Sequence, residues 1–316
     1  MTLSSHTSTC GTDIAAPEIA VPYCAVHTSR SETVAIRGLS YHVRRWGNPD
    51  GKPVWLLHGW MDVSASYQFL ADCLLAHNEQ LNLFAPDWRG FGLTSTPPNC
   101  DGYWFADYLA DLDALLTHYH ADNCVDLVAH SMGGNIAMLY AGAKPQRVAH
   151  VVNLDGIGLA DSDPAKAPSR YAKWLDELRE PSTFTPYAQL SGVVSRLQKN
   201  NPRLPLAQAQ FLAPHWATLG ADGLWHIQGD AAHKRSNPIL YRTAEVLACW
   251  AAITAPVLMV EPSDLSTRRW LKISDMDERL SRIQHLKQLM IDDAGHMLHH
   301  DQPALIADAI VAFLKV

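Results

Sequence analysis

The sequence lacks the features of a membrane protein and of a nucleic-acid-binding protein. No apolar stretch approaches the ~20 residues that a helix needs to cross a bilayer. Lys and Arg are scattered, number 25 against 32 Asp and Glu, and leave a formal net charge of −7. Without a basic block there is no electrostatic footprint for a phosphate backbone. We therefore expect neither a membrane span nor a nucleic-acid partner.

Paired cysteines and a secretory leader are also missing. The six cysteines lie far apart, with no Cys-x-x-Cys and no zinc-ligand spacing. Residues 1–31 are polar and rich in turn formers, without the basic and apolar regions of a signal peptide. We interpret them as an N-terminal arm. The sequence predicts a cytoplasmic protein without structural metal or disulfides.

What is present is ordinary core-forming material: 47% of the 316 residues are hydrophobic and 18% are charged. Short apolar runs typical of buried strands alternate with segments of helical periodicity. The strands are expected at Thr33–Ile36, Tyr41–Trp46, Pro53–Leu57, Leu81–Pro86, Cys124–Ala129, Val148–Leu154, Pro256–Val260 and His285–Ile291. This alternation predicts a mostly parallel sheet with helices on both faces.

The alternation is interrupted between residues 160 and 252. That stretch shows helix-like pieces broken by prolines and no buried-strand pattern. It is far longer than an ordinary loop, so we expect an ordered helical insertion that forms a cap over the sheet. The predicted organisation is an arm over 1–31, a core over 32–159 and 253–316, and a cap over 160–252.

One serine lies between a predicted strand and a predicted helix. Ser131 follows the run that ends at Ala129, and the helix formers begin just after Gly133. Small residues two positions before and two after the serine permit a sharp turn that exposes its hydroxyl. The pattern is Ala-x-Ser-x-Gly, close to the Gly-x-Ser-x-Gly of a nucleophile elbow.

Polar residues follow several of the predicted strands and should meet at one edge of the sheet. His58, Asp155, Glu261, Asp264 and His296 each come directly or soon after such a strand. Active sites of open α/β sheets lie at the carboxyl ends of their strands. A histidine can take the proton of a serine hydroxyl while a carboxylate orients the histidine. The residues therefore point to nucleophilic catalysis.

Four segments in this order resemble the α/β-hydrolase superfamily, in its serine-hydrolase-like and esterase-like branch. They are His58-Gly59-Trp60, Asp87-Trp88-Arg89-Gly90-Phe91-Gly92, His130-Ser131-Met132-Gly133-Gly134 and Ala294-Gly295-His296-Met297. The resemblance implies an eight-stranded, mostly parallel sheet flanked by helices, with a helical cap.

The resemblance also implies roles for single residues. Ser131 matches the nucleophile and His296 the base. The backbone N–H groups of Trp60 and Met132 match the oxyanion hole. Asp264 has the usual spacing for the acid and is the first choice. Asp155 is the alternative location known in such folds, and Glu261 ranks third.

Other candidates concern the substrate pocket. His58, Gly59 and His130 adjoin the expected catalytic residues. The tryptophans of the cap, Trp174, Trp216 and Trp225, line an apolar acyl pocket or form the core of the cap. His299-His300-Asp301 resembles a metal cluster, but adjacent histidines point in different directions, so we interpret it as polar residues before Pro303.

The predicted function is hydrolysis of a carboxylic ester with an apolar acyl group, through an acyl-enzyme and without cofactor or metal. The same residues would also suit a thioester, a lactone, an amide or a carbon–carbon bond. A slow-turnover ligand sensor on this fold is a further alternative. Dehalogenases and epoxide hydrolases resemble the chain in fold and cap, but they have an aspartate at the elbow. The serine at position 131 argues against these two classes. The sequence does not indicate whether the chain is a monomer or an oligomer.

Overall fold

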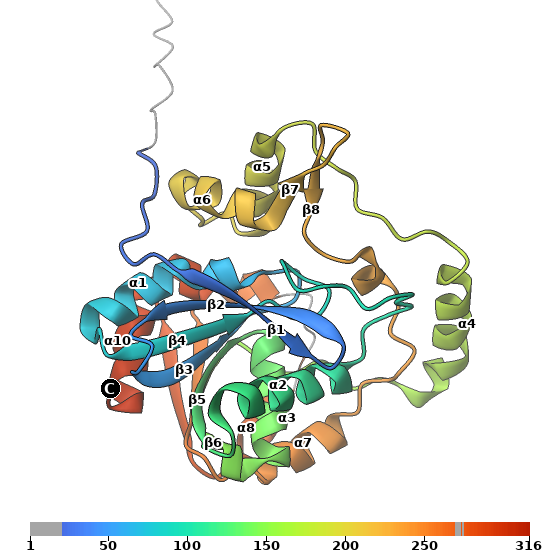
Figure 1. The fold of residues 1–316 in the computed structure, drawn as a ribbon. Helices are drawn as coiled ribbons and strands as arrows, with labels where there is room; N and C mark the ends of the chain where they lie inside the picture. The colour runs from blue at the N-terminus through green and yellow to red at the C-terminus, as the bar shows by residue number, and fades with distance from the viewer. Residues whose placement is uncertain (1–20, 269–272, 274) are drawn as a thin grey trace, which may run out of the picture.

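A computed structural model describes residues 21–268, 273 and 275–316 of the chain. These residues form an eight-stranded sheet in the order β1-β2-β4-β3-β5-β6-β9-β10 (Figure 1). β2 is antiparallel to β1 and to β4, and the other neighbours are parallel. The strands are β1 (Arg30–Ile36), β2 (Leu39–Gly47), β3 (Lys52–Leu57), β4 (Leu81–Pro86), β5 (Val125–His130), β6 (Val148–Leu154), β9 (Val257–Pro262) and β10 (Leu286–Ile291). The mostly parallel sheet predicted from the alternation is confirmed.

Each central strand is apolar on both sides because helices cover both faces of the sheet. In β3, Trp55 and Leu57 face one core cluster, whereas Val54 and Leu56 face another. All four side chains are at most 1% exposed. Continuous apolar runs of this kind are typical of parallel strands buried on both faces.

The first core cluster lies under α2, α3 and α7, and the second lies under α1, α9 and α10. The helices are α1 (Gln68–His77), α2 (Phe105–His120), α3 (Met132–Ala143), α4 (Ala167–Glu177), α5 (Leu190–Asn200), α6 (Leu206–Trp216), α7 (Thr243–Ala251), α8 (Met276–Leu280), α9 (Leu298–Asp301) and α10 (Pro303–Leu314). Short 3-10 helices are η1 (Ser64–Tyr67), η2 (Pro145–Arg147), η3 (Pro164–Lys166), η4 (Ala231–Lys234) and η5 (Leu265–Arg268). In the described part of the chain, no helix is both long and apolar enough to cross a membrane.

The cap between β6 and β9 contains more than helices. α5 and α6 pack together over η1 around a third apolar cluster. Two short strands, β7 (Ala217–Leu219) and β8 (Trp225–Ile227), form a hairpin beside them (Figure 1). The helical insertion predicted for this stretch therefore also contains a hairpin, whose three-residue strands are too short to show a periodicity.

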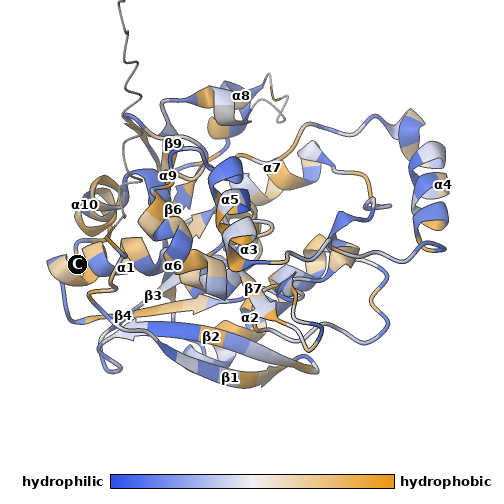
Figure 2. Cartoon of the chain, turned by 90° about the horizontal axis from the view of Figure 1, so that it is seen from above, coloured by the Kyte–Doolittle hydropathy of each residue, from blue (hydrophilic) through white to orange (hydrophobic). Residues whose placement is uncertain are grey.

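The last helix of the predicted cap packs on the core instead. α7 approaches α3 so closely that a Cβ on Gly142 would lie 2.0 Å from the Cys249 carbonyl oxygen. Trp250 on α7 is 1% exposed and belongs to the first core cluster. We therefore place the end of the cap before α7 rather than at residue 252. α4, in contrast, lies apart from the sheet in both views and has no buried residue (Figure 2).

The described part of the N-terminal arm is attached to α1. The backbone N–H groups of Val26 and His27 donate to the Asp72 carboxylate at 3.0 and 2.8 Å, and the Tyr23 hydroxyl donates to it as well. β1 already begins at Arg30, so the arm ends slightly earlier than predicted. Residues 1–20 of the predicted arm lie outside the described residues.

Candidate active site

Ser131 occupies a sharp turn between β5 and α3. Its backbone has φ 50° and ψ −113°, a region that residues with a Cβ rarely adopt. The neighbours make the turn possible by being small: a Cβ on Gly133 would lie 2.2 Å from the Leu57 carbonyl oxygen. Ala129 is completely buried beneath the turn. Backbone strain of this kind is characteristic of functional sites, and it holds the serine hydroxyl above the sheet edge.

Ser131, His296 and Asp155 form a continuous chain of hydrogen bonds. His296 Nε2 lies 3.0 Å from Ser131 Oγ, and His296 Nδ1 lies 2.6 Å from Asp155 Oδ2. The three residues follow β5, β10 and β6, so their proximity comes from strand ends that meet at one edge. Asp155 is 2% exposed, and the His296 side chain is 18% exposed. This is the order of contacts that activates a serine hydroxyl.

The loop after β6 holds Asp155 in place. Asn153 Nδ2 donates to the Gly156 carbonyl oxygen and Asn153 Oδ1 accepts from the Gly156 N–H, both at 2.8 Å. Asp155 itself has φ 56° within this clamped turn. Its second oxygen, Oδ1, accepts a hydrogen bond of 2.5 Å from Arg268 Nη1. Each carboxylate oxygen therefore has its own partner, which fixes the plane of the carboxylate.

The first-choice acid from the sequence does not occupy this position. The Asp264 carboxylate accepts from Arg203 Nη2 at 3.3 Å and from the Ser266 N–H at 3.0 Å. These hydrogen bonds, that of Ser266 first, lower the pKa of Asp264. The expectation that Asp264 orients His296 is corrected in favour of the alternative, Asp155.

The third-ranked acid, Glu261, also has a different partner: it accepts from Arg268 Nη2 at 2.9 Å. The spacing along the chain had favoured Asp264 as the acid. The structure instead brings His296 Nδ1 to the carboxylate at the end of β6.

Trp60 lies on the loop after β3 and Met132 directly follows Ser131, and both line the same cavity as Ser131. Met132 is the first residue of α3, so its N–H is at the positive end of the helix. The loop before Trp60 passes against the elbow, because a Cβ on Gly59 would lie 2.9 Å from His130 Nδ1. Within the described residues, neither the Trp60 nor the Met132 N–H donates to a protein acceptor. Both remain candidates for the oxyanion hole.

A cavity of about 650 Å³ opens at Ser131 between the core and the cap segment. Its volume falls within the ordinary range for small-molecule sites. Aromatic and aliphatic side chains provide much of its lining: Trp60, Tyr103, Trp104, Phe105, Tyr108, Leu139, Leu159, Tyr241, Val246 and Trp250. Arg170, Arg235 and Arg242 add positive charge.

The cap tryptophans predicted for this pocket do not line it. Trp216 is 6% exposed and packs in the cap cluster with Val63 and Phe69, and Trp225 packs against the same cluster. Trp174 on α4 contacts the edge of Trp104, with ring centroids 6.3 Å apart. The apolar faces of these tryptophans are covered by the cap itself, or in the case of Trp174 by a residue that lines the cavity.

His58, Gly59 and His130 were also predicted for the pocket, but the described lining does not include them. His58 Nδ1 donates to the Gly59 carbonyl oxygen at 2.7 Å, and Nε2 accepts from the Trp88 N–H at 2.9 Å. Burial lowers the pKa of His58 to about 4, which keeps the ring neutral. His130 Nε2 donates to the His296 carbonyl oxygen at 2.8 Å. These residues support the loops of the site from beneath.

Two groups of site residues escaped the sequence analysis. Arg268 is the last residue of the short 3-10 helix η5, a segment without periodicity, so nothing in the sequence marked it as a partner of Asp155. The run Tyr103-Trp104-Phe105 before α2 lines the cavity, and three consecutive aromatic residues at a helix start were a signal that could have indicated it.

The comparison with protein-family models matches residues 52–303 to the α/β hydrolase fold. The chain belongs to this family. A serine hydrolase-like protein of Dictyostelium discoideum is 24% identical over 304 residues, which cover 90% of this chain and 82% of the relative. A serine hydrolase-like protein of Danio rerio is 25% identical over 281 residues, covering 85% and 83%.

Solved structures agree on the architecture. The thioesterase domain from the curacin biosynthetic pathway superposes with a TM-score of 0.78 at 21% identity, over 90% of this chain and 99% of that domain. At this identity the likeness shows the fold alone. The α/β hydrolase with its mostly parallel eight-stranded sheet is thus established, and the chain is a hydrolase of this family.

Proposed function

We propose that the protein hydrolyses carboxylic esters through an acyl-enzyme formed on Ser131. The observation that carries this proposal is the hydrogen-bonded chain from Ser131 Oγ through His296 to Asp155, which opens into a largely apolar cavity. A serine hydroxyl needs a base within hydrogen-bond reach to act as a nucleophile. The elbow, the base and the orienting carboxylate meet that requirement together.

In the proposed reaction, His296 Nε2 takes the proton of Ser131 as Oγ attacks the ester carbonyl carbon. The N–H groups of Trp60 and Met132 donate to the oxyanion that forms. The protonated His296 then gives its proton to the leaving alcohol, and the ester C–O bond breaks. Water, deprotonated by the same histidine, then attacks the acyl carbonyl carbon. The bond from Ser131 Oγ to that carbon breaks, His296 returns the proton to Oγ, and the acid is released. Asp155 stabilises the imidazolium in both halves of the reaction.

The proposed substrate has an apolar acyl group. Aromatic side chains such as Trp104, Tyr108 and Trp250 would bury an alkyl or aryl acyl chain next to Ser131. Burial of each methylene contributes about 0.8 kcal/mol. The same catalytic groups serve thioesters, lactones, amides and carbon–carbon bonds, and the fold also suits a slow-turnover sensor. We favour the ester because an alcohol leaves more readily than an amine, and no additional group is required.

The test combines turnover and adduct formation. Purified protein is assayed with p-nitrophenyl esters of graded acyl length, and with the thioester, lactone and amide of the preferred acyl group. Ser131→Ala should lose at least about 1000-fold in kcat while keeping its circular dichroism spectrum and melting temperature. A fluorophosphonate should label Ser131 in the wild type and leave Ser131→Ala unlabelled. Labelling without multiple turnovers would indicate the sensor, and a Ser131→Ala variant with a tenth of wild-type activity would refute the assignment.

A further inference from the structure

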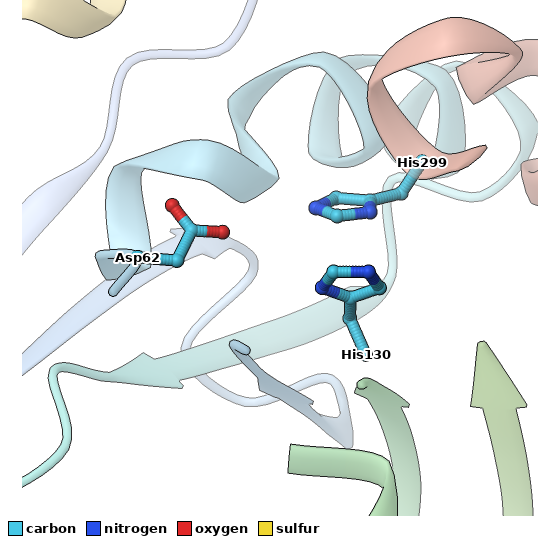
Figure 3. Close-up of side chains that lie close together, drawn as sticks. All are labelled: Asp62, His130 and His299. Atoms are coloured by element: carbon cyan, nitrogen blue, oxygen red, sulfur yellow. The ribbon is translucent and has the colours of Figure 1, made fainter. Parts of the chain in front are cut away.

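A group of three side chains that could ligate a metal ion lies behind the turn at Ser131, outside the cavity. Asp62 comes from the loop before η1, His130 from the end of β5 and His299 from α9. One donor atom from each residue lies within 4.8 Å of the donor atoms of the other two. Figure 3 shows the Asp62 carboxylate directed toward the two imidazole rings, which lie one above the other. The residues are 3%, 2% and 0% exposed.

Four buried polar atoms of this group have no hydrogen-bond partner among the described residues. These atoms are Asp62 Oδ2, His130 Nδ1, and both ring nitrogens of His299. An unsatisfied buried polar atom costs roughly 1–3 kcal/mol, so several in one place require an explanation. The indole N–H of Trp216 lies near Asp62 but forms no hydrogen bond of ordinary length with it. Within the part of the chain that the structure describes, no protein group therefore satisfies these atoms.

The outer atoms of two of these residues are, in contrast, fixed. His130 Nε2 donates its proton to the His296 carbonyl oxygen at 2.8 Å, which leaves a lone pair on Nδ1. Asp62 Oδ1 accepts from the Val63 N–H at 2.9 Å and from the Ser66 hydroxyl, which leaves Oδ2 directed inward. Metal-ligating histidines and carboxylates are characteristically oriented in this way, by hydrogen bonds from the atom that does not bind the ion.

The donors also indicate which kind of ion would fit. Imidazole nitrogen is a donor that divalent transition metals prefer, and the group supplies it from His130 and from His299. Two imidazoles and one carboxylate form a donor set of a kind found around zinc.

We propose that Asp62, His130 and His299 bind one divalent transition-metal ion, with Zn²⁺ as the best match to the donors. Bonds of about 2.0–2.2 Å to a tetrahedral zinc place donor atoms roughly 3.3 Å apart, so a small rotation of the side chains closes the group around the ion. A water molecule takes the fourth position. The site joins the core to η1 and α9, and the bound ion stabilises the folded chain by mass action.

The experiment uses the full chain after treatment with EDTA and dialysis. Zn²⁺ is titrated into the protein to saturation and its binding is followed by calorimetry. Co²⁺ is added to a separate sample, whose d–d absorption spectrum reports the coordination geometry. Mg²⁺ serves as a hard-ion control. The expected result is one Zn²⁺ per chain, a higher melting temperature and a tetrahedral Co²⁺ spectrum, with no response to Mg²⁺. Anomalous diffraction at the zinc edge should place the ion between the three side chains.

The variants separate this site from adventitious binding. Asp62→Asn and His299→Asn should bind Zn²⁺ at least about tenfold more weakly. His300→Asn is the matched control, because His300 is equally buried beside His299 but lies outside the group. His226→Gln removes the exposed pair of His226 with Asp222, which offers a surface alternative for adventitious zinc. Affinity that falls with His226→Gln but not with Asp62→Asn would overturn the proposal. If the variants do not fold, an anomalous map of zinc-soaked wild-type crystals with only water in the group would overturn it equally.

Discussion

The replacement Asp155→Asn is the most incisive test of the catalytic arrangement. Arg268 donates to Asp155 Oδ1 at 2.5 Å, and an arginine has no atom that accepts a hydrogen bond. The amide oxygen of the asparagine must therefore face Arg268, and its NH₂ group must face His296 Nδ1. An NH₂ donor stabilises the imidazole tautomer that carries its proton on Nε2. That nitrogen then cannot accept the proton of Ser131.

The expected cost of the wrong tautomer is about 10⁴-fold in kcat with little change in KM, which corresponds to about 5.5 kcal/mol of activation free energy. The matched control is Asp264→Asn. The Asp264–Arg203 pair is about one third exposed on each side, so this variant should stay within about twofold of wild-type kcat. Both are measured in the ester assay, with melting curves to verify folding. Equal losses in the two variants, or a fall of less than tenfold in Asp155→Asn, would refute the reasoning.

Three further changes test the surroundings of the site. Arg268→Gln should lower kcat by up to about 100-fold at nearly constant KM, because Asp155 loses the donor that fixes its plane. Trp104→Ala should change the ranking of esters by acyl length, by about 1–3 kcal/mol of discrimination per lost contact. Trp216→Ala should leave that ranking unchanged and lower the free energy of unfolding by about 3–5 kcal/mol. The reverse pattern would show that Trp216 lines the pocket. Burial raises the pKa of Asp62 to about 7, above its value of about 3.9 in the unfolded chain, so the wild type loses stability as the pH rises from about 4 to about 7. About two pKa units of this loss fall between pH 5 and pH 8, so urea unfolding of metal-free protein should show Asp62→Asn gaining on the wild type by up to about 3 kcal/mol at the higher pH.

Much of the core was predictable because its physics is local. Buried strands such as Leu81–Pro86 and Val148–Leu154 have the predicted bounds. The elbow was also predictable, since its small residues are close to the serine in the sequence. Which cap residues line the cavity was not predictable. Whether Trp216 faces the cavity or its own cluster depends on how α6 lies on η1, and no local pattern encodes that packing.

The acid shows why spacing alone was insufficient. β6 and β9 are parallel neighbours, so the residues that follow them arrive at the same sheet edge and both satisfy the chain order. What distinguishes them is the Asn153–Gly156 clamp, which turns Asp155 inward, and Arg203, which holds Asp264 at the surface. Both contacts link residues whose pairing cannot be deduced from hydrophobic periodicity.

His130 contacts both the proposed catalytic arrangement and the proposed metal site. One ring nitrogen donates to the backbone of His296, and the other faces Asp62 and His299. Its neighbour in the chain is Ser131, whose backbone is already strained. A displacement of the ring toward a bound ion would therefore act on the nucleophile through one peptide unit and on the base through one hydrogen bond. The contacts behind the elbow therefore reach both the proposed nucleophile and the proposed base, because packed elements transmit small shifts rather than absorbing them.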